Sequence, residues 1–227
     1  MQLLIGNKNY SSWSMRPWVL MRHFGIPFDE VMVRFDAMAA GSRFKQRVTQ
    51  VSPAGRVPVL VDGDLVVWDT LAIAEYLAER FPQHALWPRD AKQRARARSL
   101  SAEMHAGFSA LRSHFPQNLE ASLPEVGRRV LAEQAGVRDD LQRIGQMWSD
   151  ALAASGGAFL FGAFGIVDAF YAPVAGRIRT YGLPLPDAAA AYAQRLLASP
   201  GVAAWIQEAL AEKDFLDFEE PYRTSRE

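Results

Sequence analysis

The strongest constraint on the fold is a change of pattern close to residue 88. Before it, short apolar runs typical of strands alternate with longer runs of helical spacing. Beyond residue 90 no run has convincing strand character, and long stretches rich in Ala, Leu, Arg, Glu and Gln are interrupted only at Pro and Gly. The pattern predicts an α/β N-terminal domain over residues 1–82 and an all-helical C-terminal domain over residues 88–227.

The residue pattern of the N-terminal part predicts the order strand, helix, strand, helix, hairpin and helix. Strands are expected at residues 3–5, 28–35, 57–61 and 65–68, with Asp62, Gly63 and Asp64 as the hairpin turn between the last two. The helices are expected from residue 14 to the stop at Gly25, within residues 36–51, and from residue 70 to the stop at Pro82. A strand–helix–strand opening implies two parallel strands joined by a right-handed crossover.

Polar residues separate the first strand from the first helix, in the order Tyr10, Ser11, Ser12, Trp13 and Ser14; we call residues 10–14 the serine turn. Ser14 is expected to cap the helix, which would place Pro17 in its first turn, where a missing N–H is harmless. Taken alone, this is an ordinary polar loop before a helix.

Composition excludes several classes of function. The chain has no cysteine, so it has no disulfide framework, no thiolate metal site and no cysteine nucleophile. Its 25 basic and 25 acidic residues balance, which argues against a nucleic-acid partner, and the basic run at residues 92–98 is expected to be a solvated helix face. No apolar run resembles a signal peptide or a membrane span, and His23, His84 and His114 have no metal-like spacing. We therefore expect a cytoplasmic protein that does not bind metal.

Two further motifs are compatible with ligand binding. Val57 and Pro58 begin a strand; a trans proline at a sheet edge is the ordinary interpretation, whereas a cis bond would expose the Val57 backbone to an extended peptide. Asp69 and Thr70 begin a helix, where simple capping is the ordinary interpretation. The free N–H groups of the same helix end could also bind a carboxylate, while Asp69 attracts an ammonium group.

The serine turn, Val57–Pro58 and Asp69–Thr70 occur in an order and at separations that resemble the glutathione transferase superfamily. Residues 159–162, followed by Asp168 and Pro173, resemble a further signature of its helical domain. Each motif alone is weak, but the four in order are specific, and the resemblance covers essentially the whole chain. The turn is most similar to the serine-using bacterial and zeta-like members, whose pattern is Ser-Ser-Cys-x-x-Arg.

This resemblance implies a thioredoxin-like N-terminal domain, an all-α C-terminal domain and a homodimer. It implies that glutathione is the co-substrate and that a small hydrophobic electrophile binds between the domains. The Val57–Pro58 bond would be cis, with the Val57 backbone pairing with the cysteinyl unit, and Asp69 and Thr70 would hold the γ-glutamyl end. Alternatives with the same fold are a non-catalytic glutathione-binding or stress-interaction protein, and a glutathione-dependent isomerase or peroxidase.

The sequence departs from the family pattern in three places. Thr70 stands where Ser is commoner, which keeps the hydroxyl, and Trp13 replaces the zeta-class Cys, which weakens the case for a zeta-type isomerase. Gly165 replaces the usual Ser or Thr before Asp168. Because the Asp168 carboxylate can still accept from the Gly165 N–H, half of a capping box is expected to remain.

The catalytic hydroxyl is expected to be that of Ser11, with Ser12 second and Tyr10 as a tyrosine alternative. Arg16 is expected either to hold the serine turn or to pair with a surface carboxylate.

Residues outside the turn supply the rest of the expected site. Lys45, with Arg43 beside it, could reach the glycyl carboxylate of glutathione or lie solvated on the surface. Spacings of three and four place His105, Phe108 and Arg112 on one helical face, which either lines the co-substrate pocket or, for His105, belongs to the core.

Overall fold

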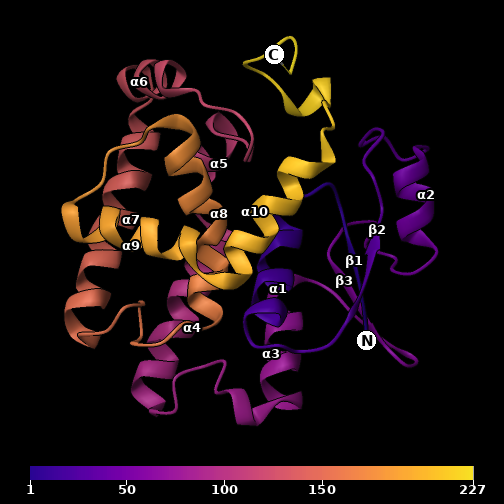
Figure 1. Ribbon diagram of the computed structural model, residues 1–227, viewed down its shortest axis with the longest axis horizontal. Coiled ribbons are helices and arrows are strands. Elements are labelled where there is room, and N and C mark those ends of the chain that lie inside the picture. The colour runs from indigo at the N-terminus through magenta and orange to yellow at the C-terminus, as the bar shows by residue number, and fades with distance from the viewer. Residues whose placement is uncertain (227) are drawn as a thin grey trace.

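The computed structural model describes residues 1–226, with a four-stranded sheet at one side and helices making up the rest (Figure 1). The N-terminal part contains β1 (Gln2–Ile5), α1 (Ser12–His23), β2 (Asp29–Met32), α2 (Arg43–Thr49), β3 (Val59–Asp62), β4 (Leu65–Val67) and α3 (Thr70–Arg80). After the short helix η1 (Pro82–His84) come α4 (Ala91–Ala106), α5 (Ser109–His114), α6 (Pro124–Glu133), α7 (Ala135–Ser155), α8 (Ile166–Tyr181), α9 (Asp187–Ala198), α10 (Pro200–Glu212) and η2 (Asp217–Glu219). The predicted fold class is confirmed.

The sheet has the strand order β2-β1-β3-β4. β1 and β2 are parallel, as the strand–helix–strand opening predicts, and β3 is antiparallel to both β1 and β4. Because successive side chains of a strand point to opposite faces, Leu3 and Ile5 join the large core with α1 and α3. Leu4 points the other way, into a smaller core that includes Phe44 and Val48 of α2.

Helix α1 begins earlier than the sequence predicted. Its first residue is Ser12, and its cap is Ser11, whose hydroxyl oxygen accepts from the Ser14 N–H at 3.4 Å. The expectation that Ser14 caps the helix is therefore wrong, and Pro17 lies inside the helix rather than in its first turn. α1 packs against α8 and α10 as well as against the sheet, so it connects the two parts of the molecule.

The centre of the helical part is α8, which is buried along most of its length. Asp168 lies in its first turn and is 1% exposed. Its carboxylate accepts from the Gly165 N–H at 2.9 Å, from the Leu160 N–H at 3.2 Å and from the Tyr192 hydroxyl at 2.8 Å. The predicted half of a capping box is confirmed, and burial raises the pKa of Asp168 to about 6.

The helical part contains no full strand among the described residues, as predicted. Extended pairing there is limited to two isolated bridges, Phe159 with Gly162 and Phe161 with Ala163. Within residues 1–226, no helix has the length and apolar character that a membrane span requires.

Candidate active site

A cavity of about 450 Å³ opens beside the N-terminal end of α1. The serine turn forms one wall with Tyr10, Ser11, Ser12 and Trp13. Other walls come from the N-terminal part, from helices α5 and α8, and from the C-terminal segment that follows α10: Phe35, Met38, Phe44, Lys45, Arg56, Val57, Arg112, Pro116, Arg177 and Glu219. The cavity therefore lies where the sheet, the helical part and the C-terminal segment meet.

Two serine hydroxyls of the turn reach this cavity. Ser11 is buried and donates to Ser14 Oγ at 2.7 Å, while Ser14 Oγ accepts from the Gly6 N–H at 3.1 Å. Ser12, the first residue of α1, is half-buried and lines the same wall. Both hydroxyls lie at the positive end of the α1 dipole, where a negatively charged ligand atom is stabilised. Ser14 is fully buried and is not a lining residue.

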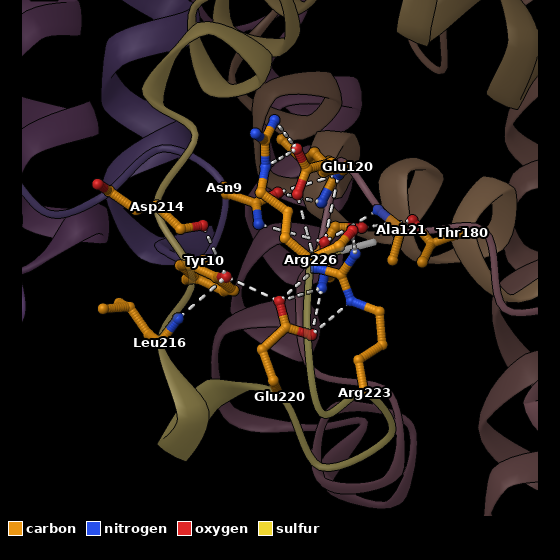
Figure 2. Close-up of polar contacts among 12 residues, drawn as sticks. Asn9, Tyr10, Glu120, Ala121, Thr180, Asp214, Leu216, Glu220, Arg223 and Arg226 are labelled. Atoms are coloured by element: carbon orange, nitrogen blue, oxygen red, sulfur yellow. Dashed lines mark hydrogen bonds and ion pairs between the residues drawn. The ribbon is translucent and has the colours of Figure 1, made fainter.

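The Tyr10 hydroxyl is held by the C-terminal segment, defined as residues 213–226 (Figure 2). It donates to the Glu220 carboxylate at 2.7 Å and lies 3.2 Å from the Asp214 carbonyl oxygen. Asn118 also donates to Glu220, at 2.8 and 2.9 Å, and Arg223 pairs with it. Burial and the neighbouring Glu220 charge raise the pKa of Tyr10. The tyrosine is thus committed to a buried network rather than available to a ligand.

Val57 precedes the first paired residue of β3 and lines the cavity. The Val57–Pro58 peptide bond is cis, as the resemblance implied, and Pro58 is buried. The pairing of β3 with β1 begins at Val59, opposite Leu4. Val57 therefore stands outside the sheet ladder, on the cavity side.

Asp69 and Thr70 begin α3 as the sequence predicted. Asp69 is the N-cap, and its carboxylate accepts from the Leu71 N–H at 3.0 Å. The same carboxylate lies 3.1 Å from His105 Nε2, and the Thr70 hydroxyl lies 3.4 Å from His105 Nδ1. His105 in turn meets the ring of Trp13 edge-on, with ring centroids 5.1 Å apart. These contacts connect the start of α3 to the wall of the cavity.

The expected helical face of His105, Phe108 and Arg112 does not exist. α4 ends at Ala106, Gly107 is extended, and Phe108 has a left-handed backbone before α5 begins at Ser109. A single helical spacing cannot continue across this break. Arg112 lines the cavity, Phe108 is buried in the main core, and His105 lies against the start of α3 rather than among the lining residues.

Lys45 is the basic residue of the α2 region that reaches the cavity. It is half-buried, and its Nζ donates to the Gly55 carbonyl oxygen at 2.7 Å. Arg43 instead pairs with Asp36 on the exposed surface. Arg16 is 1% exposed, so of the two roles considered for it, the pairing with a surface carboxylate is wrong.

Sequence reasoning missed the C-terminal segment. Its buried Glu220 contacts Tyr10 and Asn118, and Arg226 pairs with Glu120, across separations of more than 100 residues (Figure 2). A Glu in a polar tail carries no signal of burial, so only the three-dimensional structure identifies this wall. Within the described residues there is no group of three or more His, Cys, Asp and Glu side chains that could hold a metal ion.

Two family models match the chain, one in each of its two parts. The model of the glutathione S-transferase N-terminal domain matches residues 10–80, and that of the C-terminal domain matches residues 75–208. Glutathione S-transferase Z1 of Arabidopsis thaliana is 35% identical over 92 residues, 39% of this chain and 40% of that protein. A zeta-class glutathione S-transferase of Euphorbia esula is 34% identical over 85 residues, 37% of this chain and 36% of that protein. The matched region thus spans about two fifths of these curated relatives.

A glutathione transferase homologue from Burkholderia, solved with bound glutathione, has a similar fold. It superposes with a TM-score of 0.68 at 23% identity, covering 94% of this chain and 98% of the other. Because the C-terminal family model alone matches more than half of the residues, the relationship does not depend on the shorter curated matches. The chain belongs to the glutathione S-transferase family, and zeta-class members are among the proteins that it resembles.

Proposed function

We propose that this protein is a glutathione transferase, which binds glutathione in the cavity beside α1 and joins it to an electrophile through a new bond to the glutathione sulfur. The observation that carries the proposal is the meeting of three elements at one cavity. The hydroxyls of Ser11 and Ser12 lie at the N-terminal end of α1, Val57 stands outside the ladder, and Trp13 contacts His105 beside the start of α3. Together they offer a place for the sulfur, the peptide and the γ-glutamyl end of one ligand.

The peptide portion of glutathione would be held by hydrogen bonds to the protein backbone and by charged side chains. The N–H and C=O of Val57 could form main-chain hydrogen bonds with the cysteinyl unit, as an extended peptide does when it adds to the edge of a sheet. The N-terminal end of α3 suits the γ-glutamyl carboxylate, and Asp69 suits its ammonium group. Lys45 lines the same cavity, and its ammonium group suits the glycyl carboxylate.

The serine hydroxyls would favour the thiolate. A free thiol has a pKa of about 8.5, so only a few per cent is ionised at neutral pH. A hydroxyl that donates to sulfur stabilises the charged form, and the α1 dipole adds to that effect. Lowering the thiol pKa by about two units requires about 2.7 kcal/mol, which one charge-assisted hydrogen bond and a helix end together supply. Ser11 is our first choice and Ser12 the second.

The proposal is tested by retention on immobilised glutathione, followed by conjugation assays with several classes of electrophile. Retention and elution by free glutathione, together with turnover above the uncatalysed rate, are expected. Retention without turnover would instead favour a non-catalytic glutathione-binding protein. If the protein were neither retained on the column nor active in any assay, a glutathione site would be refuted altogether.

We also propose that the protein acts in the cytoplasm as a homodimer, in keeping with its family. Sedimentation velocity is expected to give a species of twice the 25.2 kDa chain mass, and a single species at the chain mass would contradict this.

Tyr10→Phe is expected to leave turnover unchanged within about threefold, because the Tyr10 hydroxyl is committed to Glu220 rather than to the ligand. The same change is expected to lower the free energy of unfolding by about 1–2 kcal/mol, since a buried carboxylate loses one donor. Steady-state kinetics and urea unfolding measure the two effects. A large loss of turnover at unchanged stability would make Tyr10 the catalytic hydroxyl.

A further inference from the structure

The described lining residues of the cavity include one carboxylic acid, Glu219 of η2. The other titratable side chains on its walls are those of Tyr10, Lys45, Arg56, Arg112 and Arg177. Arginine keeps its proton in proteins, and the Tyr10 hydroxyl is committed to Glu220. Lys45 belongs to the wall proposed for the glycyl end of glutathione. Glu219 is therefore the lining residue best suited to give a proton to a molecule in the cavity.

The short helix that carries Glu219 is anchored at both ends. Before it, the Leu216 N–H donates to the Tyr10 hydroxyl oxygen at 3.4 Å, and the Leu216 carbonyl oxygen accepts from the Glu219 N–H at 2.8 Å. After it, Glu220 is 5% exposed, and its carboxylate accepts from Tyr10 and Asn118 (Figure 2). The backbone at Glu219 is thus a fixed part of the cavity wall rather than part of a free tail.

The surroundings of Glu219 favour its protonated form. The residue is half-buried, and its carboxylate takes part in none of the ion pairs found within residues 1–226. Burial raises the pKa of Glu219, and the charge of the neighbouring Glu220 adds to this shift. The four basic side chains that line the cavity act in the opposite direction, but none of them pairs with Glu219. A thiolate bound in the cavity would add a negative charge, which favours the protonated acid further.

The contact between Glu220 and Tyr10 also brings Glu219 to the serine turn. Tyr10 directly precedes Ser11, and Ser11, Ser12 and Glu219 line one cavity. In Figure 1 the C-terminal segment (yellow) passes between α5 and α2, both of which contribute residues to that cavity. An electrophile that meets the glutathione sulfur beside Ser11 would therefore lie in the same cavity as the Glu219 carboxyl group.

We propose that Glu219 is a catalytic acid of this transferase, which gives its proton to the oxygen of an epoxide when the glutathione sulfur attacks the ring. The proposal rests on the transferase function proposed above. The sulfur forms a bond to one ring carbon, the bond from that carbon to oxygen breaks, and the oxygen takes the carboxyl proton, which water later restores. Because an alkoxide is a far stronger base than a carboxylate, this proton transfer assists ring opening. A departing chloride ion needs no proton, so the acid has no role in chloride displacement.

Two electrophiles with the same aromatic group test the proposal: 4-nitrostyrene oxide and 4-nitrobenzyl chloride. In both, the sulfur can bond to the carbon beside the nitrophenyl ring, but only the epoxide oxygen requires a proton. Glu219→Gln is expected to lower kcat for the epoxide by about a hundredfold, which is within the range of general acid catalysis. After correction for the uncatalysed rates, its effect on the chloride is expected to stay within about threefold.

The pH dependence of kcat at saturating glutathione gives a second measurement. The native protein is expected to lose epoxide turnover at low pH, where the thiol is protonated, and again at high pH, where Glu219 is ionised. Turnover of the chloride is expected only to rise with pH toward a plateau. In Glu219→Gln the fall of epoxide turnover at high pH is expected to disappear, a change that a purely structural role would not produce.

Matched variants make the result specific. Asp217→Asn removes a carboxylate from an exposed position in the same short helix and is expected to leave both substrates unaffected. Glu219→Asp keeps the acid on a shorter side chain and is expected to retain part of the epoxide turnover. The KM for glutathione, measured with the chloride, and the circular dichroism spectrum are expected to be unchanged in Glu219→Gln.

The contrary outcomes are distinct. Equal losses on both substrates in Glu219→Gln would show that the residue serves glutathione binding or the fold, and would overturn the proposal while leaving the transferase function intact. Full epoxide turnover in Glu219→Gln would have the same meaning, as would a native protein that turns over the chloride and not the epoxide. Turnover of neither substrate would also overturn the proposal, and the retention and conjugation assays described above would then decide the transferase function separately.

Discussion

Ser11→Ala is expected to lower kcat/KM for glutathione conjugation by about tenfold to a hundredfold, the worth of one hydrogen bond to a charged sulfur. The hydroxyl of Ser11 lies at the start of α1 and lines the cavity. At present it donates to Ser14 Oγ at 2.7 Å, so it must rotate toward the ligand when a thiolate binds. The pKa of enzyme-bound glutathione is expected to rise toward the value of the free thiol, and the pH dependence of kcat/KM for the electrophile at saturating glutathione measures it.

Ser12→Ala is the matched control for this experiment, because Ser12 belongs to the same turn and lines the same wall. It is expected to have a much smaller effect on turnover. Ser11→Ala also removes the N-cap of α1, which costs about 1 kcal/mol of stability, so urea unfolding must show that the variant is folded under assay conditions. A loss of turnover in Ser12→Ala but not in Ser11→Ala would transfer the catalytic role to Ser12.

Asp168→Ala is expected to reduce the free energy of unfolding by about 3–5 kcal/mol. The substitution leaves three buried donors without their acceptor: the N–H groups of Leu160 and Gly165 and the hydroxyl of Tyr192. Each unsatisfied donor costs about 1–3 kcal/mol. Since α8 forms the centre of the helical part, the loss should appear as a lower urea midpoint for the whole chain.

Asp139→Ala provides a comparison for that measurement, because Asp139 lies exposed on α7. It is expected to change the unfolding free energy by less than about 0.5 kcal/mol. Asp168→Asn keeps one oxygen acceptor and is expected to fall between the two. If Asp168→Ala were no more destabilising than Asp139→Ala, the buried carboxylate would not be organising the start of α8.

Much of the N-terminal fold follows from local sequence patterns. Short apolar runs, the Asp62-Gly63-Asp64 turn and the Asp69 cap each act over a few residues, and the structure forms the corresponding elements where they were expected. The capping contact between Asp168 and Gly165 was predictable for the same reason. The division at residues 82 and 88 stays a prediction. Errors arose where two local signals competed, as with Ser11 and Ser14 for the start of α1.

The sequence by itself thus determined the order of elements, the family resemblance and the turn that carries the proposed chemistry, because these depend on neighbouring residues. Only the tertiary structure decided which side chains surround that turn. It committed the Tyr10 hydroxyl to Glu220, 210 residues away, and it broke the expected helical face at Phe108. It also brought Arg112 and Arg177 to the wall beside Trp13. Burial and charge pairing between distant segments are properties of packing, and no local pattern encodes them.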